Sequence, residues 1–159
     1  MSCPKCMPEA GQNGTCYNSY YENIVDDKRR VQVPSNWRQG ATETEFMLLL
    51  WPGGPQKEIC LMVLPPEAAR RLTDRITAMP FGDPQVESLR RQLGRNSQMV
   101  TSDKAGRLTL PEHMARAAGI EKKTVLVGMF DRFQIWSPER HAIVCEADAA
   151  LGQDAMKLI

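Results

Sequence analysis

The sequence contains one nine-residue pattern twice, as Asp26-Asp27-Lys28-Arg29-Arg30-Val31-Gln32-Val33-Pro34 and again as Asp103-Lys104-Ala105-Gly106-Arg107-Leu108-Thr109-Leu110-Pro111. The first Asp, the Arg and the final Pro are identical in the two copies, and both apolar positions are kept. A second match follows each copy, because Leu64-Pro65-Pro66-Glu67 ends an apolar run as Trp136-Ser137-Pro138-Glu139 does later. A pattern that returns together with its context indicates two copies of one supersecondary unit.

Each copy predicts a turn, then a short strand, then the start of a helix. Asp26 and Asp103 open the turns, because an Asp carboxylate accepts backbone N–H groups just downstream. Gly106 suits a tight turn in which φ is positive. The prolines that end the two copies suit the first turn of a helix. Apolar residues alternate with polar ones, as in a half-buried strand, at Val31, Val33, Leu108 and Leu110.

A β-hairpin is predicted after each of these units. In the first copy its strands are residues 46–51 and 59–64, joined by Pro52-Gly53-Gly54-Pro55. In the second copy they are residues 124–130 and 133–136, joined near Asp131-Arg132. Strand-forming runs separated by such turn residues are typical of antiparallel hairpins.

The two motifs and the second hairpin together resemble the MraZ family. That family carries Asp-x-Lys-Gly-Arg-(apolar)-x-(apolar)-Pro in its first repeat, where this chain has Arg29 in place of Gly, and Asp-x-x-Gly-Arg in its second. Residues 125–136 look very like the family's second-repeat hairpin, and the resemblance extends from about Tyr17 to Val144. It implies a transcriptional regulator of the bacterial division and cell-wall gene cluster, from the swapped-hairpin group that includes AbrB and SpoVT. It also implies a homo-oligomer, possibly a ring, that reads short direct repeats in double-stranded DNA.

The expected fold is α+β and β-rich. Two swapped-hairpin AbrB-like repeats interlock into one pseudo-twofold β-barrel, since each is too small to bury its apolar face alone. Trp51 and Trp136 are expected in the strand core, and Trp37 on a short helix. The predicted organisation is a flexible extension (1–16), the first SpoVT/AbrB-like repeat (17–66), a helical hairpin connector (67–97), the second repeat (98–144) and a short C-terminal tail (145–159).

The connector reads as two helices separated by residues 80–84, with Asp83 as the N-cap and Pro84 at the first helical position. Arginines decorate both helices, at Arg70, Arg71, Arg75, Arg90, Arg91 and Arg95. We favour a solvated helix face on which acidic residues such as Asp74 and Glu87 are their partners. The alternative is a supplementary face that contacts phosphates or another subunit.

Composition and charge limit the class of protein. The 159 residues make one ordinary domain, or two small ones that share a core, and 42% hydrophobic with 25% charged residues is typical of a globular chain. No apolar run approaches the roughly 20 residues that span a bilayer, and no signal peptide is visible in the first twenty residues. A cytoplasmic protein without a membrane partner is therefore expected, and the resemblance to a transcriptional regulator implies that it is nucleoid-associated. The net charge is only +1, so DNA affinity must come from a local basic site, repeated in an oligomer.

The basic residues of the two turns are the candidate DNA contacts. The predicted DNA-binding residues are Lys28, Arg29, Arg30, Arg38, Lys104 and Arg107, and the residues that shape the turns are Asp26, Asp103 and Gly106. Alternatively, the Asp and Arg of each motif merely pair across the turn. Pairing is favoured in the second copy, which has only two positive charges. DNA contact is favoured in the first, because folding alone poorly explains three consecutive basic residues, and Arg reads guanine bidentately.

The cysteines and histidines predict no metal site and no cofactor. Cys3 and Cys6 have zinc-knuckle spacing and Cys16 follows, but a structural zinc site needs a fourth ligand, and none stands nearby. Cys60 and Cys145 read as ordinary buried or half-buried thiols. His113 and His141 are isolated, and the sequence has no phosphate-binding glycine loop, HExxH pair or GxSxG elbow, so an enzyme is not predicted.

Three functions follow, in order of preference. The first is a sequence-specific DNA-binding repressor. The second is an antitoxin-like swapped-hairpin module whose main partner is a protein, although such antitoxins usually carry one hairpin unit and a long tail. The third is a thiol- or zinc-dependent redox protein built on Cys3, Cys6 and Cys16.

Overall fold

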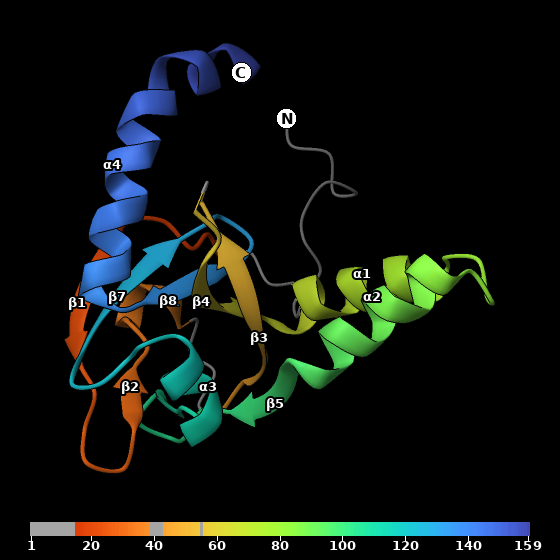
Figure 1. Ribbon diagram of the computed structural model, residues 1–159. Helices are drawn as coiled ribbons and strands as arrows, with labels where there is room; N and C mark the ends of the chain where they lie inside the picture. Colours follow the sequence, from red (N-terminus) through yellow and green to blue (C-terminus); the bar gives the residue numbers. More distant parts are fainter. Residues whose placement is uncertain (1–14, 39–42, 55) are drawn as a thin grey trace, which may run out of the picture.

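The computed structural model describes residues 15–38, 43–54 and 56–159 (Figure 1). The first repeat contains β1 (Tyr20–Ile24), β2 (Arg30–Gln32), the 3₁₀ helix η2 (Ser35–Trp37), β3 (Glu45–Gly53) and β4 (Glu58–Leu64). The connector holds α1 (Pro66–Thr77) and α2 (Pro84–Arg95). The second repeat contains β5 (Ser97–Thr101), β6 (Arg107–Thr109), α3 (Glu112–Ala117), β7 (Lys123–Gly128) and β8 (Phe133–Trp136), followed by α4 (Pro138–Ala155) and the 3₁₀ helix η3 (Met156–Leu158).

The strands form one large antiparallel sheet and one short ribbon. The sheet has the order β1-β7-β8-β4-β3-β5, so the first strand of each repeat pairs with the hairpin of the other repeat. The ribbon pairs β2 with β6, again one strand from each repeat. An α+β, β-rich architecture is thereby confirmed. The predicted closed barrel is not found, because β1 and β5 are the two ends of the sheet among the described strands.

One face of the sheet packs against the ribbon, η2 and α3; β2 and α3 lie below the sheet in Figure 1. An aromatic cluster centres on the buried ring of Phe133, whose centroid lies 4.9 Å from that of Trp37, 5.6 Å from Tyr17 and 5.9 Å from Phe46. Trp37 also donates its indole N–H to the carbonyl of Asn18, at 3.0 Å. The short element after the first motif therefore anchors the core.

The other face is covered by helices. Leu49, Met62 and Leu64 pack against α1, and Cys60 packs with Trp136 beside Val144 of α4. The expected position of Trp136 is confirmed, since it is buried. The expectation for Trp51 is wrong: it lies near the tip of the β3–β4 hairpin and is 38% exposed.

The connector forms the two predicted helices, which extend away from the sheet together (Figure 1). Asp83 caps α2, because its carboxylate accepts the Gln85 N–H at 2.8 Å. Arg70 and Arg71 pair with Glu67, and Arg91 pairs with Glu87. These exposed pairs favour the interpretation of a solvated helix face.

The predicted boundary between second repeat and tail, after residue 144, falls inside α4. Ser137 caps this helix by accepting the Arg140 N–H at 3.2 Å, and Pro138 occupies its first turn. Alanine-rich sequence with high helix propensity continues the helix through residue 155. No described helix has the length and apolarity to span a membrane. The predicted extension falls mainly on residues 1–14, outside the described residues.

Candidate nucleic-acid interface

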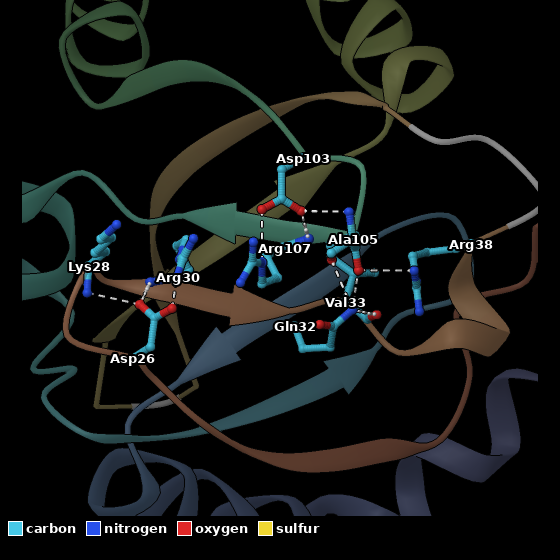
Figure 2. A network of polar contacts seen from close by, with 10 residues as sticks. Asp26, Lys28, Arg30, Gln32, Val33, Arg38, Asp103, Ala105 and Arg107 are labelled. Atoms are coloured by element: carbon cyan, nitrogen blue, oxygen red, sulfur yellow. Dashed lines mark hydrogen bonds and ion pairs between the residues drawn. The ribbon is translucent and has the colours of Figure 1, made fainter.

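The two motif turns have the same hydrogen bonds (Figure 2). In the first, Oδ1 of Asp26 accepts the backbone N–H groups of Lys28 and Arg30, at 2.9 and 2.8 Å, and Oδ2 lies 2.6 Å from Nε of Arg30. In the second, Oδ1 of Asp103 accepts the N–H groups of Ala105 and Arg107, at 3.0 and 2.9 Å, and Oδ2 lies 2.8 Å from Nε of Arg107. The Asp therefore closes each turn and orients the Arg that starts the following strand.

These contacts lower the pKa of both carboxyl groups below the ordinary value of 3.8. For Asp26 and Asp103 alike, the largest cause is the hydrogen bond from the backbone N–H of the motif Arg. The ion pair with the same Arg acts in the same direction, while partial desolvation of the carboxylate opposes it. Both carboxylates consequently stay charged to a lower pH than a free Asp and keep the turns closed.

Both turns require a residue with positive φ at the fourth position. Gly106 has φ +79°, and Arg29 has φ +59° at the equivalent place. In each turn the N–H of this residue donates to the carbonyl of the opening Asp at 2.9 Å. A non-glycine residue with positive φ is uncommon. Arg29 nevertheless adopts the same turn conformation as Gly106.

The β2–β6 ribbon presents one face to the core and the other to solvent. Val31 and Leu108 pair across the ribbon and are buried. The residues on either side of them alternate to the outer face, which therefore carries Arg30, Gln32, Arg107 and Thr109. We call this face, together with Lys28 and Lys104 in the adjoining turns, the ribbon surface. The major groove of DNA admits a two-stranded β-ribbon.

The predicted basic residues fall into three groups. Lys28 and Lys104 are exposed, and no partner for their ammonium groups is seen in residues 15–38, 43–54 and 56–159. Arg30 and Arg107 are held by their aspartates through Nε. Pairing across the turn thus occurs in both copies, including the first, where it was not the favoured interpretation; their DNA contacts remain a prediction.

Arg29 and Arg38 make contacts between the repeats. Nε of Arg29 donates to the carbonyl of Leu110 at 3.2 Å. Nη1 of Arg38 donates to the carbonyl of Ala105, in the second turn, at 3.1 Å. The side chain of Arg38 also lies against Gly106, where an added Cβ would overlap it. A direct role for either at DNA stays a prediction.

Sequence reasoning missed Gln32 as a residue of the site. Its amide donates to the carbonyl of Ala105 at 2.8 Å, so it braces the second turn from the first repeat (Figure 2). The alternation of Val31 and Val33 gave the available signal, since it places residue 32 on the outer face of the strand.

No thiol or imidazole takes part in the hydrogen bonds described for the two turns. Burial raises the pKa of Cys60 to about 12, so its thiol stays protonated. Cys16 and Cys145 are exposed, which corrects the expectation of a buried or half-buried Cys145. Sγ of Cys145 lies 3.4 Å from Nε2 of His141. Across the described ranges, no group of three or more His, Cys, Asp or Glu side chains is placed to hold a metal ion; Cys3 and Cys6 lie outside those ranges.

Comparison with known proteins identifies the class. The chain is 31% identical over 137 residues to the transcriptional regulator MraZ of Xanthomonas oryzae pv. oryzae, covering 84% of this chain and 93% of that protein. It is 34% identical over 129 residues to the protein of the same name from Herpetosiphon aurantiacus, covering 81% and 86%. The Caulobacter vibrioides transcriptional regulator MraZ is 34% identical over 125 residues, 76% of each chain. The family model described as "MraZ protein, putative antitoxin-like" matches residues 93–156.

A chain with this α+β sheet and this similarity over most of its length is a transcriptional regulator. It belongs to the MraZ family.

Proposed function

We propose that the chain represses transcription by binding double-stranded DNA through the ribbon surface. The observation that carries this proposal is the repeated turn. Two closed turns flank one ribbon, and each presents an exposed lysine beside an oriented arginine. Lys28 and Lys104 contact phosphates, while Arg30 and Arg107 direct their terminal nitrogens toward bases, since Nε of each is already bound to its aspartate.

Binding requires several copies of the chain. One ribbon neutralises few phosphates, and affinity falls steeply with salt in proportion to the phosphates contacted. A homo-oligomer, possibly a ring, places several ribbons along a series of short direct repeats and gains affinity through multivalency. Within each subunit, the repeats at 17–66 and 98–144 act as swapped hairpins about a pseudo-twofold axis. The regulated genes are those of the division and cell-wall cluster, the site of action is the nucleoid in the cytoplasm, and no catalysis is involved.

Selection of bound fragments from a random and a genomic DNA pool tests the proposal. Regularly spaced short repeats should be enriched by the wild-type protein. Enrichment should be lost in Arg30→Ala, which removes an arginine directed toward bases. A Lys28→Ala/Lys104→Ala variant should instead bind all fragments more weakly, whereas Lys157→Ala, which removes one exposed lysine of η3, should bind like the wild type. Light scattering should give a mass larger than a dimer. Absence of enrichment even at low salt, or a monomer that binds tightly, contradicts the proposal.

A second candidate is binding to a protein, as the description of the matching family, "putative antitoxin-like", suggests. The projecting end of α4 and η3 supports it, because Leu151, Met156 and Leu158 are exposed there. A Leu151→Ser/Leu158→Ser variant separates the candidates: it should leave DNA selection unchanged if the ribbon surface is the functional site.

A further inference from the structure

The positive-φ positions of the two turns are equivalent in the fold. The N–H of Leu110 donates to the carbonyl of Arg29 at 2.8 Å, and the N–H of Val33 donates to the carbonyl of Gly106 at 2.9 Å. Each turn is therefore hydrogen-bonded in the same way to the strand end of the other repeat. Arg29 and Gly106 differ only in the side chain that one of them carries.

The space beside Gly106 is filled by an arginine from the other repeat. A Cβ built on Gly106 would overlap Cδ, Nη1 and Nε of Arg38. Nε of Arg38 is buried, and no hydrogen-bond partner for it is seen in the described part of the chain. Gly106 thus serves two purposes, a positive φ and room for the side chain of Arg38.

The space beside Arg29 is arranged in the opposite way. The two motifs begin 77 residues apart, at Asp26 and Asp103, so the residue that corresponds to Arg38 is Ala115, which is small and buried. Ala115 and Arg29 line the same open cavity of about 330 Å³. Where the second turn has a glycine and receives an arginine from the other repeat, the first turn has its own arginine and faces an alanine of the other repeat.

Both guanidinium groups tie a turn to the other repeat. Nη1 of Arg38 donates to the carbonyl of Ala105, within the second turn, at 3.1 Å. Nε of Arg29 donates from the first turn to the carbonyl of Leu110 in the second repeat, at 3.2 Å. Each turn consequently has one side-chain arginine tie across the repeat boundary in addition to its backbone bonds.

We propose that Arg29 and Arg38 are exchanged equivalents, each a positioning residue that fixes one DNA-contacting turn. The inference rests on the proposed function for its role at DNA, but the exchange itself concerns the turns alone. The proposal means that Arg38 positions the second turn, although Arg38 itself belongs to the first repeat. It also makes the two pairs, Arg29 with Ala115 and Gly106 with Arg38, interchangeable.

Reciprocal substitutions test the exchange. Arg29→Gly should remove the tie of the first turn, and Arg29→Gly/Ala115→Arg should rebuild it in the form found at the second turn. Ala115→Arg alone should destabilise the protein, because the added side chain competes with Arg29 for one cavity. The measurements are hydrogen exchange of the backbone amides that the two aspartates hold, Lys28 and Arg30 against Ala105 and Arg107, and affinity for the DNA fragment selected by the wild type.

Arg29→Gly loses a hydrogen bond from a charged donor but also relieves the positive φ of Arg29. In Arg29→Ala, which keeps the Cβ, we therefore expect the Lys28 and Arg30 amides to exchange about tenfold faster, with the second turn unchanged. The double variant should return them to within about threefold of the wild type, and DNA affinity should follow the same pattern. If the double variant does not fold, Arg38→Ala decides: it should accelerate Ala105 and Arg107 while sparing Lys28 and Arg30.

Two results overturn the inference: a folded double variant that exchanges and binds like Arg29→Gly, or an Arg38→Ala variant that affects both turns equally or neither. Failure of the proposed function looks different. In that case the variants show the expected pattern of amide hydrogen exchange, but the wild-type protein enriches no DNA.

Discussion

Gly106→Ala measures how much the close approach of Arg38 contributes to the stability of the second turn. An Ala with φ near +79° costs about 1–2 kcal/mol, since its Cβ crowds the backbone. The new Cβ also overlaps Arg38, which must turn away and lose its hydrogen bond to Ala105, worth about 1 kcal/mol. The total of about 2–3 kcal/mol lowers Tm by roughly 4–12 °C for a chain of this size.

Gly82→Ala is the matched control, because Gly82 also has positive φ but has nothing within 4 Å of the added Cβ. It should cost only the backbone part, about 1–2 kcal/mol. In an Arg38→Ala background, Gly106→Ala should likewise fall to the cost of the control, which gives a coupling energy of about 1 kcal/mol between the two sites. Thermal and urea melts of the four variants supply these values. Equal costs for Gly106→Ala with and without Arg38, or a cost no larger than that of Gly82→Ala, would refute the argument.

Three further predictions concern the turns and the core. Folding lowers the pKa of Asp26, so the turn contributes stability above pH 3.8 that is lost as the pH falls through the lowered pKa. Asp26→Asn should therefore flatten the acid side of a plot of Tm against pH. An unchanged slope would argue against the turn contacts. Lys28→Ala should weaken binding to all DNA sequences and reduce the salt slope by about one, whereas Lys157→Ala should not, and equal effects would indicate non-specific charge. Phe133→Ala should lower the free energy of unfolding by about 3–5 kcal/mol in a urea melt. Phe81 is 93% exposed, so Phe81→Ala should change it by no more than about 0.5 kcal/mol. Similar losses for the two variants would contradict the described core.

The turns could be predicted because their chemistry is local. An Asp whose carboxylate reaches N–H groups two and four residues on needs no information from the rest of the chain. The same holds for the cap at Asp83, and for the alternation that places Val31 and Leu108 inside. Such features lie within a few residues of sequence, and the structure reproduces them.

The resemblance implied repeats that interlock, but the particular contacts between them could not be predicted, because these depend on how distant segments pack. Arg38 reads as one more basic residue near a basic turn, yet its partner Ala105 lies 67 residues away in the chain. The edge strands β1 and β5 pair with the hairpin of the opposite repeat, which no local pattern specifies. Trp37 and Trp51 differ for the same reason: the aromatic cluster covers the first, whereas the second lies near a hairpin tip.

The strand exchange has a consequence for how the site can change. Because β2 and β6 come from different repeats, neither repeat completes the ribbon surface by itself. The second turn also accepts hydrogen bonds from Gln32 and Arg38 of the first repeat, and Arg29 donates to a carbonyl of the second repeat. A substitution in one repeat is therefore felt at the turn of the other. Under the proposed equivalence of Arg29 and Arg38, a change of charge at one turn requires a matching change at the residue of the other repeat that lies beside it.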